Sequence, residues 1–170
     1  RLQTGLTRRR QPGGRFTEGA HQHMPASGEF TWPEGKRAAV SLTFDDSRLT
    51  QIDAGIPLLD SFAVKATFFA SLAQLQQRAA AWRQAAAAGH EVGNHTINHP
   101  CSCNFQWGTP HVLEEYTLER MEIELLAANQ QLEETVGVRP RTFAYPCGQK
   151  FVGRGEQVRR VEEGNRGWWR

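Results

Sequence analysis

The stretch AAVSLTFDD, residues 38–46, opens the patterned part of the sequence. A short run of β-prone apolar residues that stops at two carboxylates is typical of a buried strand ending at a polar edge. Adjacent carboxylates raise each other's pKa unless a positive group compensates them. Taken alone, the pair favours a helix cap beside a solvent-facing carboxylate, and a bound metal ion is the functional alternative.

After this strand, apolar spacing predicts alternating helices and strands. Ile52, Ile56 and Leu59 recur at helical spacing before a second strand at 66–70. The further elements that we expect are a helix over 72–88 stopped by Gly89, a strand at 90–94, a long helix over 118–132 closed by Gly137, and a last strand at 141–145. This alternation predicts a parallel α/β sheet or barrel.

Active sites of such sheets lie at the carboxyl ends of the strands. Asp45 and Asp46, then His95, then the turn at 146–148 each follow a predicted strand. We therefore expect three separated segments to meet at one edge of the sheet.

His95 and His99 stand four residues apart. On a first helical turn this spacing stacks two imidazoles on one face, as neighbouring metal ligands require. Alone, the spacing is equally consistent with solvated or packed histidines. Together with a carboxylate from the first strand, it predicts one divalent metal ion with coordination positions left open for water and substrate, which is typical of a catalytic site.

Charge and composition argue against several classes of protein. The sequence carries 20 basic and 18 acidic side chains, a net charge of +2. Residues 1–37 and 149–170 are basic, whereas residues 38–148 hold seven basic against twelve acidic side chains. An acidic body offers no continuous positive face, so we predict no nucleic-acid partner. No apolar run approaches the ~20 residues of a membrane span, and no secretory signal pattern is present.

Residues 1–37, rich in glycine, proline and polar side chains, are expected to form a flexible leader, with Met24 as a possible native start. The domain is expected over 38–152, and residues 153–170 are left as an unassigned tail. Three cysteines cannot all pair with one another, which leaves the redox compartment open. The sequence predicts neither a compartment nor an oligomeric state.

Three segments, VSLTFDDS (40–47), GHEVGNHTINHP (89–100) and RTFAYPCG (141–148), resemble ordered motifs of the polysaccharide deacetylases, the NodB-like proteins of carbohydrate esterase family 4. The resemblance covers residues 38 to about 152. It implies a NodB-like distorted (β/α) barrel, incomplete at its C-terminal end. It also implies hydrolysis of a carbon–nitrogen bond that is not a peptide bond, with N-deacetylation of an acetylated polysaccharide or oligosaccharide as the leading reaction.

Carried over by position, the resemblance implies that Asp46, His95 and His99 bind the metal ion and that Asp45 is the catalytic base. Tyr145, Pro146 and Cys147 of the third motif are then expected to contact the substrate, with the backbone N–H of Cys147 donating to the oxyanion. Zinc is the first choice of ion, with cobalt, manganese or nickel compatible with the same nitrogen and oxygen donors.

The sequence departs from the family pattern at several positions. Ser47 replaces the usual glycine after the paired carboxylates, and Ala144 stands where many members carry an arginine that pairs with the base. Arg141 could substitute only if its side chain reaches the same edge. The two later motifs of the family, one with a histidine general acid, are not matched, and no histidine follows His111. We therefore expect these 170 residues to be weakly active or inactive by themselves.

Two other interpretations compete with the hydrolase. His95, His99, Cys101 and Cys103 could form a structural zinc site without catalysis, since cysteine and histidine are the usual ligands of such sites. That reading leaves the paired carboxylates unexplained. A mononuclear iron oxygenase also uses two histidines and one carboxylate, but the order of ligands here fits it poorly.

Overall fold

The computed structural model describes residues 32–105 and 110–164 and divides the chain into two compact units, residues 1–39 and 40–170. Of the first unit, residues 32–39 are described, and they contain one short 3-10 helix, Pro33–Gly35. The expected flexible leader therefore lies mostly outside the described residues. The tryptophans of the tail, Trp168 and Trp169, lie outside them as well.

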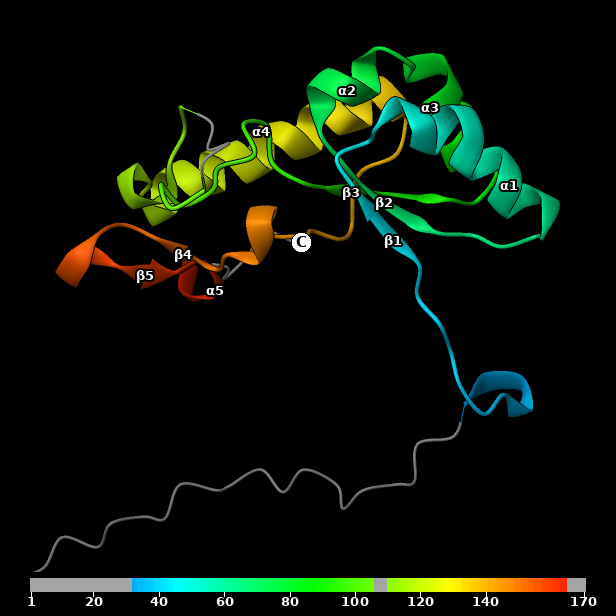
Figure 1. Cartoon of the computed structure of the whole chain (residues 1–170), viewed down its shortest axis with the longest axis horizontal. Coiled ribbons are helices and arrows are strands. Elements are labelled where there is room, and N and C mark those ends of the chain that lie inside the picture. Colours follow the sequence, from blue (N-terminus) through cyan, green and yellow to red (C-terminus); the bar gives the residue numbers. More distant parts are fainter. Residues whose placement is uncertain (1–31, 106–109, 165–170) are drawn as a thin grey trace, which may run out of the picture. The chain divides into compact units, whose positions relative to one another are not determined.

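The second unit is built on a parallel sheet (Figure 1), which confirms the predicted α/β class. The strands are β1 (Thr43–Asp45), β2 (Thr67–Ala70) and β3 (Glu91–Asn94), in the order β1-β2-β3. β1 and β2 are in register from Thr43 opposite Thr67, and a parallel bridge from Asn94 to Phe143 continues the order beyond β3. Neighbours along the chain are thus neighbours in the sheet, as in the wall of a barrel.

Two of the predicted strands are shorter than expected. The first begins at Thr43 rather than at Ala38, and Val40 is 85% exposed, since β2 starts opposite Thr43 and offers no earlier partner. The strand predicted over 141–145 is wrong as an extended element, because only the bridge at Phe143 forms. Beyond that point, the carbonyl of Ala144 accepts a bond from the His95 ring instead of extending a ladder.

The helices that accompany the sheet are α1 (Ile56–Ser61), preceded by a π-helical turn at Gln51–Gly55, α2 (Leu72–Gln76), α3 (Ala79–Ala87) and α4 (Leu118–Val136). The single helix predicted over 72–88 is wrong, because the chain breaks at Arg78, whose φ of −135° is not helical. The break lets Leu75 of α2 and Trp82 of α3 both reach full burial.

α4 is the longest element and begins and ends where its sequence signals predict. The Thr117 side chain accepts from the Arg120 N–H at its start, and Gly137 adopts φ 81° at its end. Its apolar stripe serves two cores. Leu132 and Val136 join Phe68, Leu75 and Trp82 beneath the sheet, and Met121 and Leu125 pack with Leu113, Tyr116, Val152 and Val161. α4 therefore packs both against the sheet and against the segments around residues 113–116 and 152–161, which follow the strands.

Secondary structure continues into the segment that the sequence left unassigned. β4 (Phe151–Val152) pairs antiparallel with β5 (Arg159–Arg160), and α5 (Val161–Gly164) follows. Val161 is buried in the second core, and its N–H donates to the carbonyl of Lys150. Among the described residues, no helix has the length and apolar character to cross a membrane.

Candidate metal centre

Asp46, His95 and His99 meet at the carboxyl end of the sheet. Asp46 Oδ1 lies 3.4 Å from His99 Nε2 and 3.7 Å from His95 Nε2, and the ligand atoms of the three residues lie within 4.8 Å of one another. A tetrahedral ion with ligands at about 2.1 Å holds neighbouring ligand atoms about 3.4 Å apart. The two distances from Asp46 are therefore close to the spacing that one small cation requires.

His95 is held in one orientation by the third motif. Its ring is buried, and its Nδ1 lies 2.9 Å from the carbonyl oxygen of Ala144, so Nδ1 carries the proton that is donated. This tautomer leaves the Nε2 lone pair facing Asp46. Burial lowers the pKa of His95, although the hydrogen bond to Ala144 and the two carboxylates oppose that shift. A neutral imidazole is the form that binds a metal.

The two histidines do not lie on a helical turn, which corrects the geometry predicted from their spacing. Residues 95–100 form an irregular loop in which Thr96 and His99 adopt φ of 64° and 49°. The Thr96 N–H donates to the Asn94 side chain, and the His99 N–H donates to Thr96 Oγ1. These local bonds bring the rings together, with 4.8 Å between their centroids and planes 72° apart.

A buried carboxylate on α4 supports this loop. Glu124 accepts from the Asn98 N–H at 2.7 Å, from the Asn98 side chain at 3.1 Å and from the Tyr116 hydroxyl at 2.7 Å. Burial, followed by the hydrogen bond to Glu124 and its charge, raises the pKa of Tyr116, which keeps that hydroxyl a donor. Asn94 is likewise tied to α4, through Leu125 O and Asn129. The loop is therefore positioned by the long helix.

The paired carboxylates differ in their surroundings. Asp46 and Ser47 both adopt positive φ, 75° and 51°, where residues other than glycine are strained. The Asp46 N–H donates to Phe69 O, and its side chain points at the histidines. Asp45 is 56% exposed and lies 4.0 Å from His95 Nε2, at the rim of the same site. The tight turn after β1 thus directs the two carboxylates differently.

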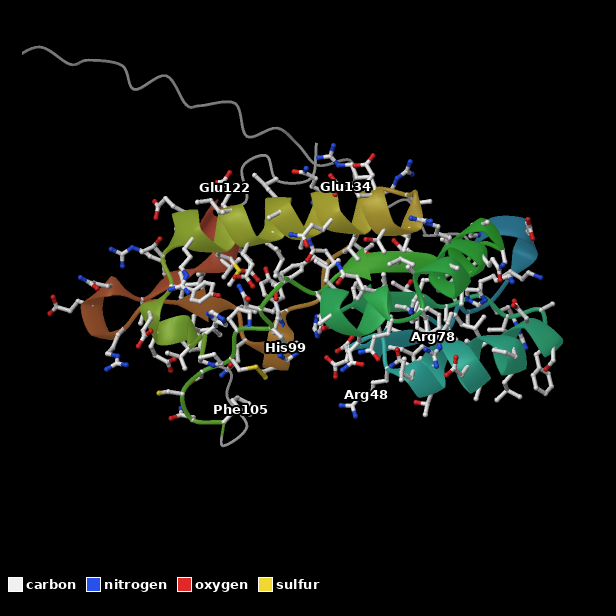
Figure 2. All side chains as sticks on the ribbon, turned by 90° about the horizontal axis from the view of Figure 1, so that it is seen from above. Arg48, Arg78, His99, Phe105, Glu122 and Glu134 are labelled. Atoms are coloured by element: carbon white, nitrogen blue, oxygen red, sulfur yellow. A yellow bond between two sulfur atoms is a disulfide. The ribbon has the colours of Figure 1, made fainter. Side chains whose placement is uncertain are left out.

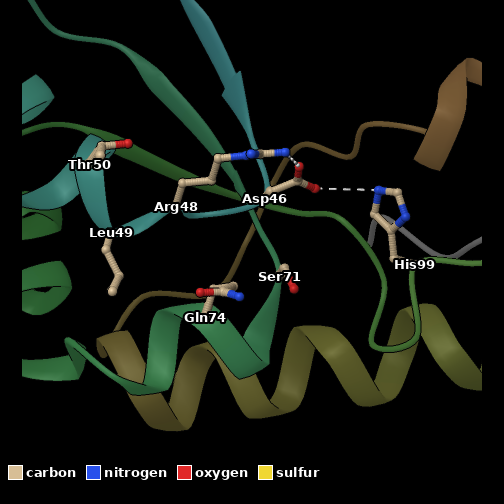
Figure 3. A pocket seen from close by; sticks show the side chains of 7 residues that line it. All are labelled: Asp46, Arg48, Leu49, Thr50, Ser71, Gln74 and His99. Atoms are coloured by element: carbon tan, nitrogen blue, oxygen red, sulfur yellow. Dashed lines mark hydrogen bonds and ion pairs between the residues drawn. The ribbon is translucent and has the colours of Figure 1, made fainter. Parts of the chain in front are cut away.

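Arg48 lies beside Asp46, with 3.2 Å between its guanidinium and Asp46 Oδ2 (Figure 3). Arg141, considered above as a substitute for the family arginine, is exposed. Arg48, in the segment after β1, therefore pairs with Asp46 rather than with Asp45.

A pocket opens beside Asp46 and His99. It has a volume of about 550 Å³ and is lined by Asp46, Arg48, Leu49, Thr50, Ser71, Gln74 and His99. Figure 3 shows these side chains around the Asp46–His99 pair, and Figure 2 places Arg48 and His99 on the same side of the unit. This volume lies in the range of small-molecule sites, about 300 to 1,000 Å³. Two residues of the candidate metal centre, Asp46 and His99, thus form one wall of this pocket.

A disulfide joins the third motif to the loop that carries His99. Cys101 and Cys147 are bonded, with their Cα atoms 5.9 Å apart. Pro146 is buried, and Cys147 adopts φ 55° in a short 3-10 turn, Pro146–Gly148. Tyr145 packs against Phe143, and burial raises the pKa of its phenol. None of Tyr145, Pro146 and Cys147 is among the residues that line the pocket described above.

The disulfide overturns the alternative of a structural zinc site. Cys101 is already bonded to Cys147, and Cys103 is exposed with its thiol directed at Glu114. The four residues of that alternative therefore do not form one ligand set in the described part of the chain.

Several residues of the site were not among those expected from the sequence pattern. Arg48 follows Asp46 by two positions, a spacing that could have signalled it. Glu124 and the carbonyl of Ala144 carry no sequence signal, because one lies within an ordinary helix and the other is backbone. The Cys101–Cys147 pair was one of three possible pairings.

Comparison with known proteins extends these observations. Residues 33–161 match the model of a family described as polysaccharide deacetylase. The chain is 34% identical over 93 residues to the uncharacterized protein YlxY of Bacillus subtilis, covering 55% of this chain and 26% of that protein. It is 31% identical over 86 residues to a peptidoglycan-N-acetylglucosamine deacetylase of Bacillus cereus, covering 49% of this chain and 40% of that one.

Among solved structures, a family 4 acetyl xylan esterase from Clostridium thermocellum, in complex with a cobalt ion, shares the fold. Its TM-score is 0.51 at 24% identity, over 64% of this chain and 49% of that one. The sequence thus spans about half of that structure and less than half of the two proteins above.

Proposed function

Because the chain belongs to the polysaccharide deacetylase family, we propose that it forms the metal-binding part of a hydrolase that removes acetyl groups from an N-acetylated glycan. The observation that carries the proposal is the convergence of Asp46 Oδ1, His95 Nε2 and His99 Nε2 beside a pocket. Two histidines and one carboxylate fill three positions and leave others for water and substrate, as in catalytic rather than structural metal sites.

Asp46, His95 and His99 would hold one divalent ion, which when bound polarises the amide carbonyl and lowers the pKa of a bound water. Zinc is our first choice, because it accepts two imidazoles and a carboxylate at the observed spacing. The cobalt ion of the Clostridium thermocellum esterase supports a divalent transition metal on this fold. Manganese and nickel are chemically compatible with the same donors.

Asp45 is proposed as the general base. Its side chain is 56% exposed and lies 4.0 Å from His95 Nε2. Asp45 is therefore close to Asp46, His95 and His99 but is not one of the three proposed metal ligands. From there, it can accept the proton of an attacking water. Arg48 pairs with Asp46 and leaves the Asp45 carboxylate outside that ion pair.

The third motif is proposed to face the acetyl group. The Cys147 backbone N–H would donate to the carbonyl oxygen as negative charge develops there, a role that needs a fixed backbone rather than a thiol. The disulfide to Cys101 ties that backbone to the loop that carries His99. Tyr145 and Pro146 would then contact the sugar from the same turn.

Departure of the amine needs a proton. We assign this proton to neither of the other two described histidines, because His90 is buried against Asp60 and His111 contacts Arg120. No histidine follows His111 in the sequence. General acid catalysis contributes about 10²- to 10⁴-fold, so we expect slow turnover from these residues by themselves.

The test combines metal analysis with an acetate-release assay on an acetylated chitooligosaccharide. The 170-residue chain is compared, at equal metal occupancy, with a version extended by the later motifs of a relative. We expect one ion per chain in both and faster acetate release from the extended version. Absence of stoichiometric metal would overturn the metal centre, and an extended, fully loaded version that releases no acetate would overturn the substrate class.

A further inference from the structure

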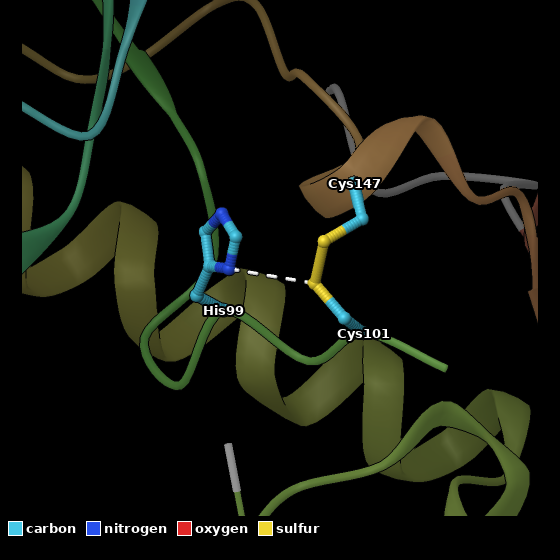
Figure 4. Close-up of side chains that lie close together, drawn as sticks. All are labelled: His99, Cys101 and Cys147. Atoms are coloured by element: carbon cyan, nitrogen blue, oxygen red, sulfur yellow. Dashed lines mark hydrogen bonds between the residues drawn. A yellow bond between two sulfur atoms is a disulfide. The ribbon is translucent and has the colours of Figure 1, made fainter. Parts of the chain in front are cut away.

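The imidazole of His99 lies between two sets of donor atoms. Its Nε2 faces Asp46 Oδ1 at 3.4 Å, and its Nδ1 faces Cys101 Sγ at 3.6 Å. Figure 4 shows the ring beside the disulfide, with the Nδ1 edge turned toward the sulfur atoms. The proposed hydrolase uses only the Nε2 edge of this ring.

The Nδ1 edge belongs to a second cluster of possible ligands. A ring nitrogen of His99, Cys101 Sγ and Cys147 Sγ lie within 4.8 Å of one another. Cys101 and Cys147 are bonded as a disulfide, which does not bind metal as thiolates do. Two thiolates and one imidazole are, by contrast, a common ligand set for zinc and other thiophilic cations.

Other contacts hold the two cysteines near each other independently of the disulfide. The Ser102 N–H donates to Gln149 Oε1 at 2.7 Å, which joins the residue after Cys101 to the turn after Cys147. The Leu113 N–H donates to Cys101 O, and Cys101 is buried. The His95–Ala144 hydrogen bond joins the same two segments. These contacts would keep the two thiols beside His99 after reduction.

We propose that reduction of the Cys101–Cys147 disulfide creates a second metal site, formed by the two sulfurs and His99, for a thiophilic divalent cation such as zinc or cadmium. A dithiol reductant supplies two electrons and two protons to the disulfide and is itself oxidised to a disulfide. The cation then displaces one proton from each thiol as it binds.

Sharing of His99 couples the two sites, and this part of the inference rests on the proposed function. A neutral imidazole offers one lone pair, so a cation bound at Nδ1 leaves Nε2 protonated and unable to bind a second ion. Loading the sulfur site therefore weakens binding at Asp46 and His95. The redox state of this disulfide would therefore decide whether His99 binds an ion together with Asp46 and His95 or together with the two sulfurs.

The experiment titrates the 170-residue chain with Cd²⁺, once oxidised and once reduced by an excess dithiol that is removed without air. Thiolate-to-cadmium charge transfer in the ultraviolet reports sulfur ligation. We expect a band that saturates at one equivalent in the reduced protein and no band in the oxidised protein. Circular dichroism of both forms verifies that the fold is kept.

Three variants assign the band. Cys103→Ser, which removes the exposed thiol outside the cluster, should leave it unchanged, and Cys147→Ser should reduce it to about half, because one of two thiolates is lost. Asp46→Asn should keep the full band, so a failure of the proposed hydrolase would not remove it. A reduced protein without the band, or a band that depends on Cys103 instead of Cys147, would overturn the inference.

Discussion

His95 Nδ1 lies 2.9 Å from the carbonyl oxygen of Ala144, and this bond joins the histidine loop to the third motif across 49 residues of sequence. The ring is almost fully buried, whereas His99 keeps 29% of its side chain exposed. The two proposed ligands therefore contribute differently to the metal-free protein.

Replacing His95 by alanine should abolish metal binding and also lower the free energy of unfolding of the metal-free protein, by about 2 kcal/mol, because it leaves a cavity and an unpaired carbonyl. His99→Ala should abolish metal binding with a much smaller loss, since its ring is partly exposed. Urea unfolding in the presence of a chelator measures both. Equal losses in the two variants would contradict the structural role of His95.

The paired carboxylates should separate binding from catalysis. Asp46→Asn should weaken metal binding, because Asp46 Oδ1 faces both histidines. Asp45→Asn should leave affinity nearly unchanged and lower acetate release, in the version extended by the later motifs, by about 10²- to 10⁴-fold. Isothermal titration and the acetate assay measure the two effects. The same loss of affinity in both variants would mean that both carboxylates ligate.

Glu124 should act on the metal without touching it. Glu124→Gln weakens the acceptor that holds Asn98 and Tyr116, so the loop with His95 and His99 loosens, and we expect metal affinity to fall by about 10- to 100-fold. Glu122→Gln is the matched control, because Glu122 lies on the same helix and points away from the loop (Figure 2). If both variants bind metal equally well, the loop does not depend on Glu124.

Ser47 should be a site of stored strain. Its φ is 51°, its side chain is fully buried, and its Oγ has no hydrogen-bond partner among the described residues. Ser47→Gly removes the backbone strain and the buried unpaired hydroxyl. The glycine also gives the unfolded chain more conformational freedom, which offsets part of this gain, so we expect the protein to gain about 1 kcal/mol of stability. Thermal unfolding measures the gain, and Ser47→Ala, which removes only the hydroxyl, should gain less. A lower melting temperature for the glycine variant would refute this account.

Asp60 should make stability depend on pH. Its hydrogen bonds to Lys65, and then to His90, hold the pKa of Asp60 below its usual value. The folded state thus favours the ionised carboxylate, so the stabilisation is present above the unfolded-state pKa, about 4, and is lost as pH falls through the lower folded-state pKa. Asp60→Asn should therefore destabilise the protein at neutral pH, with the difference from the parent shrinking below about pH 4.

Urea midpoints from about pH 2 to about pH 7 provide the measurement, with Asp53→Asn as the control. Asp53 forms one exposed ion pair with Arg78 at 3.3 Å, an interaction that contributes little to stability. A difference between the Asp60 variant and the parent that stays constant over this range would exclude the assigned hydrogen bonds as its source.

Local sequence signals were enough to predict the class of fold, the family resemblance and the polar residues that follow the strands. Apolar spacing is a local signal, and the carboxyl ends of parallel strands share one edge, so the convergence of Asp46 and His95 could be predicted from the order of the strands alone. The same reasoning identified α4 with its stripe and Gly137, because cap residues and helical periodicity act within a few positions of the chain.

The construction of the site, by contrast, depends on contacts between segments that are distant in sequence. The expected helical turn at His95 is a strained loop, because the side chains of Asn94 and Glu124 accept from its backbone N–H groups in place of the carbonyls that a helix would use. Cys101 forms a disulfide with Cys147 and is not a metal ligand beside Cys103. This pairing could not be predicted, because it depends on two segments 46 residues apart meeting in space. Contacts between such distant segments arise from packing against α4 and the sheet, so the spacing of residues along the sequence does not predict them.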